Sequence, residues 1–499
     1  MSCGLVIVDL LMVLVGQLVI GTPLRVEESF PRPLSSYHDE HLTGFFQVLS
    51  NRIAIEPLNF FATAIFLVAI VHTFLAPMFS ALGQRLEEQA HLQRLSRASD
   101  DTSGGAASFW AILFHYLGEI EAVFGIWAIP LMLSVAYMRG WADAEHFLEK
   151  TVHFDEAVFV VVVMAIASTQ PVIFLAERIL AFIAARFGSS PTAWWCVILI
   201  VGPILGSVIT EPAAMTISAI MLAQHFFRYH PSTALSYTTV AILFCNISVG
   251  GVLTNFAAPP VIMVASTWGW NTPFMFLTFG WKAICSVVAS TLAYRWLFRR
   301  ELSELSSRVM AAESSLGREY RQSMPVFVVV GNLLFLVWTV THGYSPRLVI
   351  IGFLFFLAFV DATRGFQRSV SLRAPLLVGF FLAGLVIHGE FQAWWLEPLI
   401  SRLGEPTLFV SSVALSAFND NASITYLASL VPSFSDNLKY LVVAGALAGG
   451  GLTIIANAPN PAGNALLSRF FEGGISPLRL LIAAILPLMM SVIVFVGLR

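Results

Sequence analysis

Two short polar stretches with a shared pattern interrupt apolar sequence and most constrain the fold of this chain. Residues 210–216 read Thr-Glu-Pro-Ala-Ala-Met-Thr, and residues 419–425 read Asn-Asp-Asn-Ala-Ser-Ile-Thr. Each lies between apolar runs of about 11 to 15 residues, whereas a helix that crosses a bilayer needs about 20. The pattern therefore predicts two re-entrant hairpins, with Glu211 and Asp420 at their tips. An ionised group at membrane depth is costly and marks a candidate functional site.

The composition explains why these runs are interpreted as membrane segments. Of the 499 residues, 57% are hydrophobic and 11% are charged, whereas a soluble domain has about 25% charged residues. We therefore expect an all-α polytopic membrane protein. The four cysteines are dispersed, without the spacing of a metal site or a disulfide framework. No basic stretch predicts nucleic-acid binding.

A helix-breaking segment follows each acidic stretch. Residues 250–260 contain two glycines and two prolines, and residues 449–461 contain three glycines and two prolines. Each segment also contains Leu-Thr and precedes a helix start at Thr272-Pro273 or Ser476-Pro477. Unwound backbone at membrane depth is tolerated only where it lines a cavity or is buried in protein. Interrupted segments at matching positions of two repeats indicate the binding site of a secondary transporter.

The order of these landmarks divides the chain into four parts. Residues 1–154 form N-terminal transmembrane helices and loops, 155–297 a first transport repeat, 298–325 a connector, and 326–499 a second transport repeat. The basic segments 295–325 and 364–373 are separated by two predicted spans, so they should lie on one face of the membrane. The positive-inside rule makes that face cytoplasmic.

The N-terminal part carries weaker signals. We expect residues 1–21 to be retained as a helix, 25–52 and 85–105 to be polar loops, 58–80 and 108–137 to be helices, and the chain to kink at 169–171. His115 and Glu119 are four residues apart and share a helix face. Together with Glu121 they are either a buried or interfacial polar group or part of a proton path. We favour the first interpretation because no other sequence feature points to this helix.

The tips and breaks resemble the paired hairpin tips and broken helices of the ion transporter superfamily, which includes arsenite permeases, dicarboxylate transporters and D-type sodium/proton antiporters. The resemblance covers about residues 155–498. Residues 250–260 are similar to the glycine-rich break ending in a proline pair, and 419–421 to the acidic Asn-Asp tip of the arsenite and antiporter branches. The neutral Ser-Asn-Thr type of tip in carboxylate transporters is absent. The resemblance implies two structural repeats, each with a re-entrant helical hairpin and a discontinuous transmembrane helix, and favours a cation as substrate.

The expected ion and proton site combines the two acids with neighbouring oxygen donors. Its residues are Glu211, Asp420, Asn419, Asn421, Thr210, Thr254, Asn255, Thr453 and Asn457. Such hard oxygen ligands suit Na⁺, with Glu211 and Asp420 as its carboxylate ligands, and the same carboxylates can bind a proton instead. The acids also suit plain helix capping, which is compatible with ion binding. Lys282, deep in an apolar helix, either pairs with Glu211 or Asp420 or extends its amine to the membrane interface.

The leading function is secondary-active sodium/proton antiport across a bacterial-type inner membrane. An arsenite-like or organic-anion permease of the same superfamily is the alternative, and an enzyme or receptor without transport ranks third. Metalloprotease and serine-hydrolase motifs are absent from the sequence. The expected partners are the lipid bilayer and a small inorganic cation, with no nucleic acid and with a homodimer left open. No cofactor is expected beyond the transported Na⁺ and H⁺.

Overall fold

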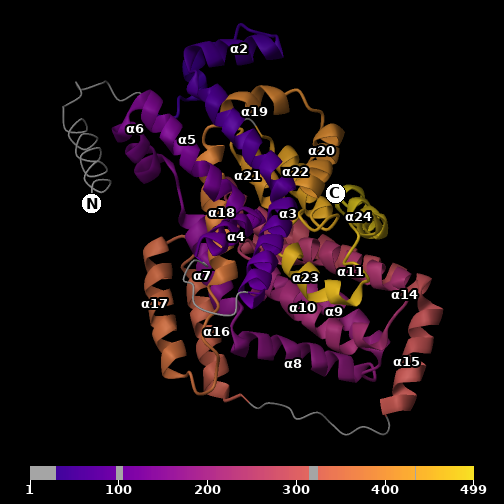
Figure 1. The fold of residues 1–499 in the computed structure, drawn as a ribbon. Helices are drawn as coiled ribbons and strands as arrows, with labels where there is room; N and C mark the ends of the chain where they lie inside the picture. Colours follow the sequence, from indigo (N-terminus) through magenta and orange to yellow (C-terminus); the bar gives the residue numbers. More distant parts are fainter. Residues whose placement is uncertain (1–29, 97–104, 314–323, 433) are drawn as a thin grey trace.

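A computed structural model describes residues 30–96, 105–313, 324–432 and 434–499 (Figure 1). Within these ranges the chain forms helices and no strands. Among the described residues, six helices are long and apolar enough to cross a membrane, and the number rises to eight if each of two bent helix pairs is one span. The expectation of an all-α polytopic membrane protein is confirmed. Residues 1–21, expected as a helix, lie outside the described residues.

The helices fall into three groups along the chain. The N-terminal group contains η1 (Leu34–Tyr37), α2 (Phe45–Ile55), α3 (Leu58–Ser96), α4 (Gly105–Leu117), η3 (Ile120–Ala122), α5 (Val123–Arg139), α6 (Trp141–His146) and η4 (Phe147–Thr151). The middle group contains α7 (Asp155–Ala167), α8 (Gln170–Arg186), α9 (Pro191–Ile209), α10 (Glu211–His225), η5 (Phe227–Tyr229), α11 (Thr233–Gly250), η6 (Gly251–Leu253), α12 (Pro259–Trp268), α13 (Thr272–Met275), η7 (Phe276–Gly280), α14 (Trp281–Leu297) and α15 (Arg299–Glu313). The C-terminal group contains α16 (Val326–Thr341), α17 (Pro346–Ala362), α18 (Arg373–Gly389), α19 (Ala393–Ile400), α20 (Glu405–Phe418), α21 (Asn421–Ser429), α22 (Asp436–Gly449), α23 (Asn460–Leu467), η8 (Ser468–Phe470) and α24 (Pro477–Gly497).

The helix pair α9 and α10 surrounds the first acidic stretch, and the two helices pack against each other. Pro191 begins α9 after Ser190, whose hydroxyl accepts a hydrogen bond from the backbone N–H of Ala193. Serine before a helix and proline at its first position are both helix-start signals. At 19 residues, α9 is long enough to span a membrane, so the expected half-length of this arm is wrong. Pro203 lies inside the helix and does not end it.

The second acidic stretch separates two shorter helices. The 14 residues of α20 and the 9 residues of α21 are both below the length of a membrane span. Helix α21 packs against α12 and α22, and α20 packs along α22. These contacts place the second turn beside the broken helices of both halves of the chain.

Both helix-breaking segments interrupt helices at the expected positions. Helix α11 ends at Gly250 and α12 begins at Pro259, while α22 ends at Gly449 and α23 begins at Asn460. The membrane-length window of α11 is 100% buried inside the protein. Figure 1 shows α10, α11, α21, α22 and α23 at the centre of the molecule, with α2 and α19 at one end and α8 and α15 at the other. The two breaks therefore lie among the central helices, and the glycines at their starts are buried.

Three expectations for the N-terminal part are corrected. Helix α3 continues to Ser96 through part of the expected loop 85–105, because Arg, Leu, Glu, Gln and Ala in that segment are strong helix formers. Helix α2 occupies part of the expected loop 25–52. The expected helix 108–137 is two helices, because the chain bends at Gly118. A Cβ atom at Gly118 would lie 2.6 Å from the backbone nitrogen of Ser80 on α3, so this close approach requires glycine.

The bend expected near residues 169–171 is confirmed. Helix α7 ends at Ala167, α8 begins at Gln170, and their axes differ by 65°. Pro171 lies in the first turn of α8, where proline is tolerated because its missing N–H has no partner there. The chain thus turns sharply before it enters α9.

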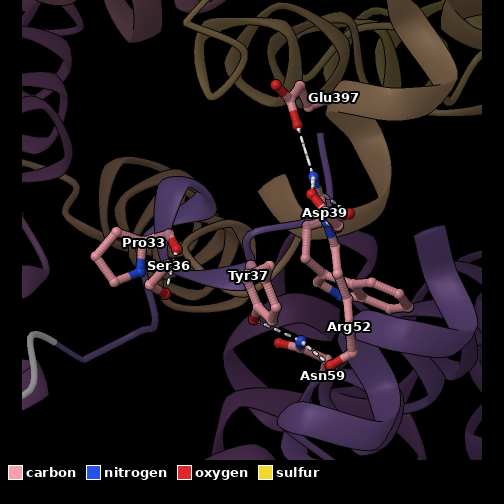
Figure 2. A network of polar contacts seen from close by, with 8 residues as sticks. Pro33, Ser36, Tyr37, Asp39, Arg52, Asn59 and Glu397 are labelled. Carbon is pink, nitrogen blue, oxygen red and sulfur yellow. Dashed lines mark hydrogen bonds and ion pairs between the residues drawn. The ribbon is translucent and has the colours of Figure 1, made fainter. Parts of the chain in front are cut away.

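A buried arginine joins the N-terminal segment to α19 (Figure 2). The guanidinium of Arg52 on α2 donates hydrogen bonds to Asp39 Oδ2 at 2.6 Å and to Glu397 Oε2 at 3.2 Å. It also donates to the carbonyl oxygen of Trp394 at 2.7 Å. Arg52 is 5% exposed, and a buried charge must be paired to be tolerated. The network therefore anchors α2 against the segment that leads into α20.

Candidate functional site

The first turn has a strained and buried backbone. Thr210 has φ 74° and ψ 151°, a conformation that a β-branched residue rarely adopts. Glu211 begins α10 and is followed by Pro212 in the first helical turn. The backbone N–H of Glu211 donates to the carbonyl oxygen of Ala257 at 3.3 Å. The first break thus holds the first turn in place.

The side chain of Glu211 contacts the second break. Its Oε2 accepts a hydrogen bond from Asn457 Nδ2 at 2.9 Å. Its Oε1 is buried and has no hydrogen-bond partner in the described part of the chain. A Cβ atom at Gly251 would lie 2.5 Å from this Oε1, so glycine is required for the first break to pass so close to the carboxylate. Glu211 is therefore enclosed by both breaks.

The second turn is arranged by local hydrogen bonds. Asp420 Oδ1 accepts from the backbone N–H of Ala422 at 2.8 Å and caps α21. Asn419 Oδ1 accepts from the backbone N–H of Asp420 at 3.0 Å. The structure thus assigns Asp420 the capping role that the sequence left open.

Asn421 connects the second turn to the second break and to the end of α11. Its backbone N–H donates to the carbonyl oxygen of Ala456 at 3.1 Å, the counterpart of the bond from Glu211 to Ala257. Its Nδ2 donates to Ser248 Oγ at the end of α11, at 3.3 Å. Its Oδ1 is buried and has no hydrogen-bond partner among the described residues. Each turn therefore makes the same backbone contact with the break in its own half of the chain.

The threonine of each break contacts the arm that precedes the acidic turn. Thr254 Oγ1 donates to the carbonyl oxygen of Ser207 at 2.7 Å, and Thr453 Oγ1 donates to that of Ala417 at 2.7 Å. In the described residues no hydrogen bond joins either hydroxyl to a carboxylate. Both threonines therefore position the turns.

A small cavity lies between the second turn and the N-terminal helices. Its volume is about 20 Å³, which is room for about one water molecule. The cavity is lined by Thr73, Ile120, Glu121, Phe381, Asn419, Asp420, Ile455, Asn457, Ala458 and Pro461. Asn457 thus lines the cavity that Asp420 faces and also contacts Glu211.

The donor set suits a small hard cation or protons. Buried oxygens of Thr210, Glu211, Asn421 and Asn457 have no hydrogen-bond partner among the described residues, and each such group calls for an explanation such as a bound ion. No group of three or more His, Cys, Asp or Glu side chains in the described ranges is arranged to hold a metal ion. The unpartnered oxygens are carboxylate, amide and hydroxyl oxygens, which are the ligand types that hard cations prefer.

Comparison with known proteins also points to a protein that acts on small cations. Residues 57–498 match the family described as "Putative Na+/H+ antiporter". The chain belongs to this family. No curated protein matches the chain. Membership of a Na⁺/H⁺ antiporter family supports a membrane transporter and favours it over an enzyme.

Two residues that we expected at the ion and proton site of this antiporter lie elsewhere. Asn255 Nδ2 donates to the carbonyl oxygen of Trp270 at 3.2 Å and to Tyr344 Oη at 3.0 Å, because its break turns the side chain towards α13 and the loop after α16. Lys282 Nζ donates to Tyr440 Oη at 2.9 Å. Among the described residues no ion pair joins Lys282 to either acid, so it is not their charge partner in this structure.

The N-terminal acids differ most from expectation. His115 and Glu119 do not pair, because α4 ends at Leu117: His115 contacts Glu87 on α3, and Glu119 forms an ion pair with Arg373 on α18. Glu121 lines the cavity with Asp420, a position that the sequence pattern did not indicate. The sequence feature that could have indicated Glu121 is a carboxylate inside an apolar run.

Sequence reasoning also missed three polar residues around the breaks. Asn460 Nδ2 donates to the carbonyl oxygens of Gly450 and Thr453, both at 2.9 Å, which closes the second break on itself. Ser207 Oγ donates to the carbonyl oxygen of Gly250 at 2.7 Å, and Ser248 Oγ to that of Leu447 at 2.8 Å. The signal for all three is a small polar side chain within or next to an apolar or helix-breaking run.

Proposed function

We propose that this protein exchanges Na⁺ for H⁺ across the membrane at a site formed by Glu211 and Asp420. The observation that carries the proposal is the position of Asn457, which donates to Glu211 and lines the cavity faced by Asp420. This residue of the second break links the acids of two separate turns. The antiporter family match supports the exchanged ions.

Competition at one site explains the exchange. Oxygen ligands suit hard cations, and buried oxygens of Glu211 and Asn457 have no hydrogen-bond partner among the described residues. A cation bound between the turns is coordinated by these oxygens and neutralises the carboxylates. Protons bound to the carboxylates also neutralise them. Each ion thus displaces the other.

The architecture belongs to the proposal as well. Residues 155–297 and 326–499 are two transport repeats of the ion transporter superfamily type, inverted relative to each other and joined by the connector 298–325. The matching contacts from Glu211 to Ala257 and from Asn421 to Ala456 support this relation. The acidic turns favour a cation over the anions carried by other members of that superfamily.

The basic segments orient the protein in a bacterial-type inner membrane. Arg299, Arg300 and Arg308 on α15 and the loop containing Arg364 and Arg368 carry most of this charge. In Figure 1, α15 and the end of α17 lie towards the same end of the molecule. The positive-inside rule makes this end cytoplasmic.

The decisive experiment replaces Asp420 by asparagine. Asparagine caps a helix about as well as aspartate, so α21 should persist while the titrating charge is removed. We expect sodium-driven proton flux to fall to background in proteoliposomes loaded with a pH dye. Glu211→Gln should abolish exchange or change its pH dependence. Full flux in Asp420→Asn with an unchanged pH profile would leave the turns as structural caps.

A further inference from the structure

A groove lies where α14 meets α15, beside the start of α9. Its volume is about 490 Å³, within the range of about 300–1,000 Å³ that is typical of ligand sites. Its lining residues on α14 and α15 recur every three or four positions from Leu292 to Ser306, which is the spacing of one helix face. The groove shares no lining residue with the cavity at the second turn.

Hydroxyl groups hold the two walls of the groove together. Thr192 in the first turn of α9 donates from Oγ1 to the carbonyl oxygen of Leu302 on α15 at 2.9 Å. The same Oγ1 lies 2.7 Å from Ser306 Oγ, and the backbone N–H of Thr192 donates to that Oγ at 3.3 Å. These contacts fix α15 against α9, so the groove has a defined shape.

Two arginines supply the charge of the groove. Arg295 lies in the last turn of α14, Arg299 begins α15, and both are exposed. In the described part of the chain neither forms an ion pair or a side-chain hydrogen bond, although the Arg299 guanidinium lies 5.6 Å from the ring centre of Trp296. No acid lines the groove in that part of the chain, and nearby Glu301 is bound to Ser232. The groove is therefore positively charged and suits an anion.

The groove also lies at the end of a membrane-length helix. The candidate span Thr272–Leu297 ends between the two arginines. On the side of this span, Leu292 is 45% exposed and Trp296 is 67% exposed, and tryptophan is enriched where a membrane meets water. The lining thus changes from apolar to basic along the helix, as a phospholipid changes from acyl chain to phosphate.

We propose that this groove binds the headgroup of an anionic phospholipid. The phosphate oxygens accept hydrogen bonds from Arg295 and Arg299, because a guanidinium presents its N–H groups in a planar fork that matches phosphate. The acyl chains contact Leu292 and Trp296. Basic pockets between membrane helices bind anionic headgroups in this way. A zwitterionic lipid adds a positive group that the arginines repel, so it binds more weakly.

The test measures lipid binding to the purified full-length protein in detergent by native mass spectrometry. The wild type should bind phosphatidylglycerol more tightly than phosphatidylcholine with the same acyl chains. The double variant Arg295→Gln and Arg299→Gln should bind phosphatidylglycerol about 30-fold more weakly, or about fivefold for each arginine. The control double variant Arg364→Gln and Arg368→Gln removes the same charge from exposed arginines outside the groove. Its affinity should stay within about twofold of the wild-type value, because distant exposed charges are screened.

Equal affinity of the wild type for the two lipids would overturn the proposal, and this comparison needs no variant. Unchanged phosphatidylglycerol binding in the groove variant would also overturn it. An equal loss in the control variant would show general attraction to surface charge in place of a site. Inorganic phosphate that displaces phosphatidylglycerol at equal concentration would make free phosphate the ligand and refute the assignment of a lipid.

Discussion

Replacing Asn457 by alanine tests whether one hydrogen bond between the two halves sets the balance between sodium and protons. Asn457 Nδ2 donates to Glu211 Oε2 at 2.9 Å, and Glu211 is 0% exposed. A hydrogen bond to a charged group contributes about 1.5–3 kcal/mol, and this one favours the carboxylate, the form that binds sodium. Its loss should favour the proton by the same amount. We expect half-maximal exchange at a given pH to need about 10- to 150-fold more sodium.

The assay measures the sodium concentration for half-maximal proton flux in dye-loaded proteoliposomes. The matched control is Asn255→Ala, the asparagine of the first break, which donates to Trp270 and Tyr344 and not to an acid. Its half-maximal sodium concentration should stay within about twofold of the wild-type value. Equal shifts in the two variants, or no shift in Asn457→Ala, would refute the role of the hydrogen bond.

Two further predictions follow from the same structure. Gly251→Ala should abolish exchange, because a Cβ atom at Gly251 would lie 2.5 Å from Glu211 Oε1. The control Gly365→Ala should keep exchange, because a Cβ atom at Gly365 would meet nothing within 4 Å. Exchange by Gly251→Ala at the wild-type rate would contradict the prediction. In a variant without the native cysteines, single cysteines at the exposed positions Ser307 and Ser369 should resist an impermeant thiol reagent in intact cells, whereas one at Tyr344, across α17, should react. Labelling of the first two from outside would reverse the proposed orientation.

The breaks and turns could be predicted from the sequence because helix breaking is local chemistry. Glycine and proline stop a helix within a few residues, so residues 250–260 and 449–461 identify the interruptions without knowledge of their neighbours. Helix length is less local. Helix α3 extends well past its apolar run because charged residues can continue a helix in water, and hydropathy measures only the apolar part.

The position of Glu121 could not be predicted because it depends on contacts between distant segments. The bend that separates α4 from α5 requires Gly118 to approach the backbone of Ser80 on α3. Without that bend, Glu121 continues the face of a single helix and points to no particular partner. The cavity also needs Phe381 from α18 and Asp420 from the second turn, and no sequence spacing reports that these segments meet.

The asparagines of the two breaks show why a repeat in the sequence does not make two equal sites. Asn255 is satisfied by Trp270, Thr272 and Tyr344, whereas Asn457 crosses to Glu211 in the other half. Asp420 lines the cavity and Glu211 does not. We infer that ions arrive at Asp420 and that Asn457 couples ion binding at Asp420 to Glu211. Asn457 lines the same cavity as Asp420 and donates a hydrogen bond to Glu211. The two breaks thus differ in where their polar groups find partners, which the sequence of each break does not determine.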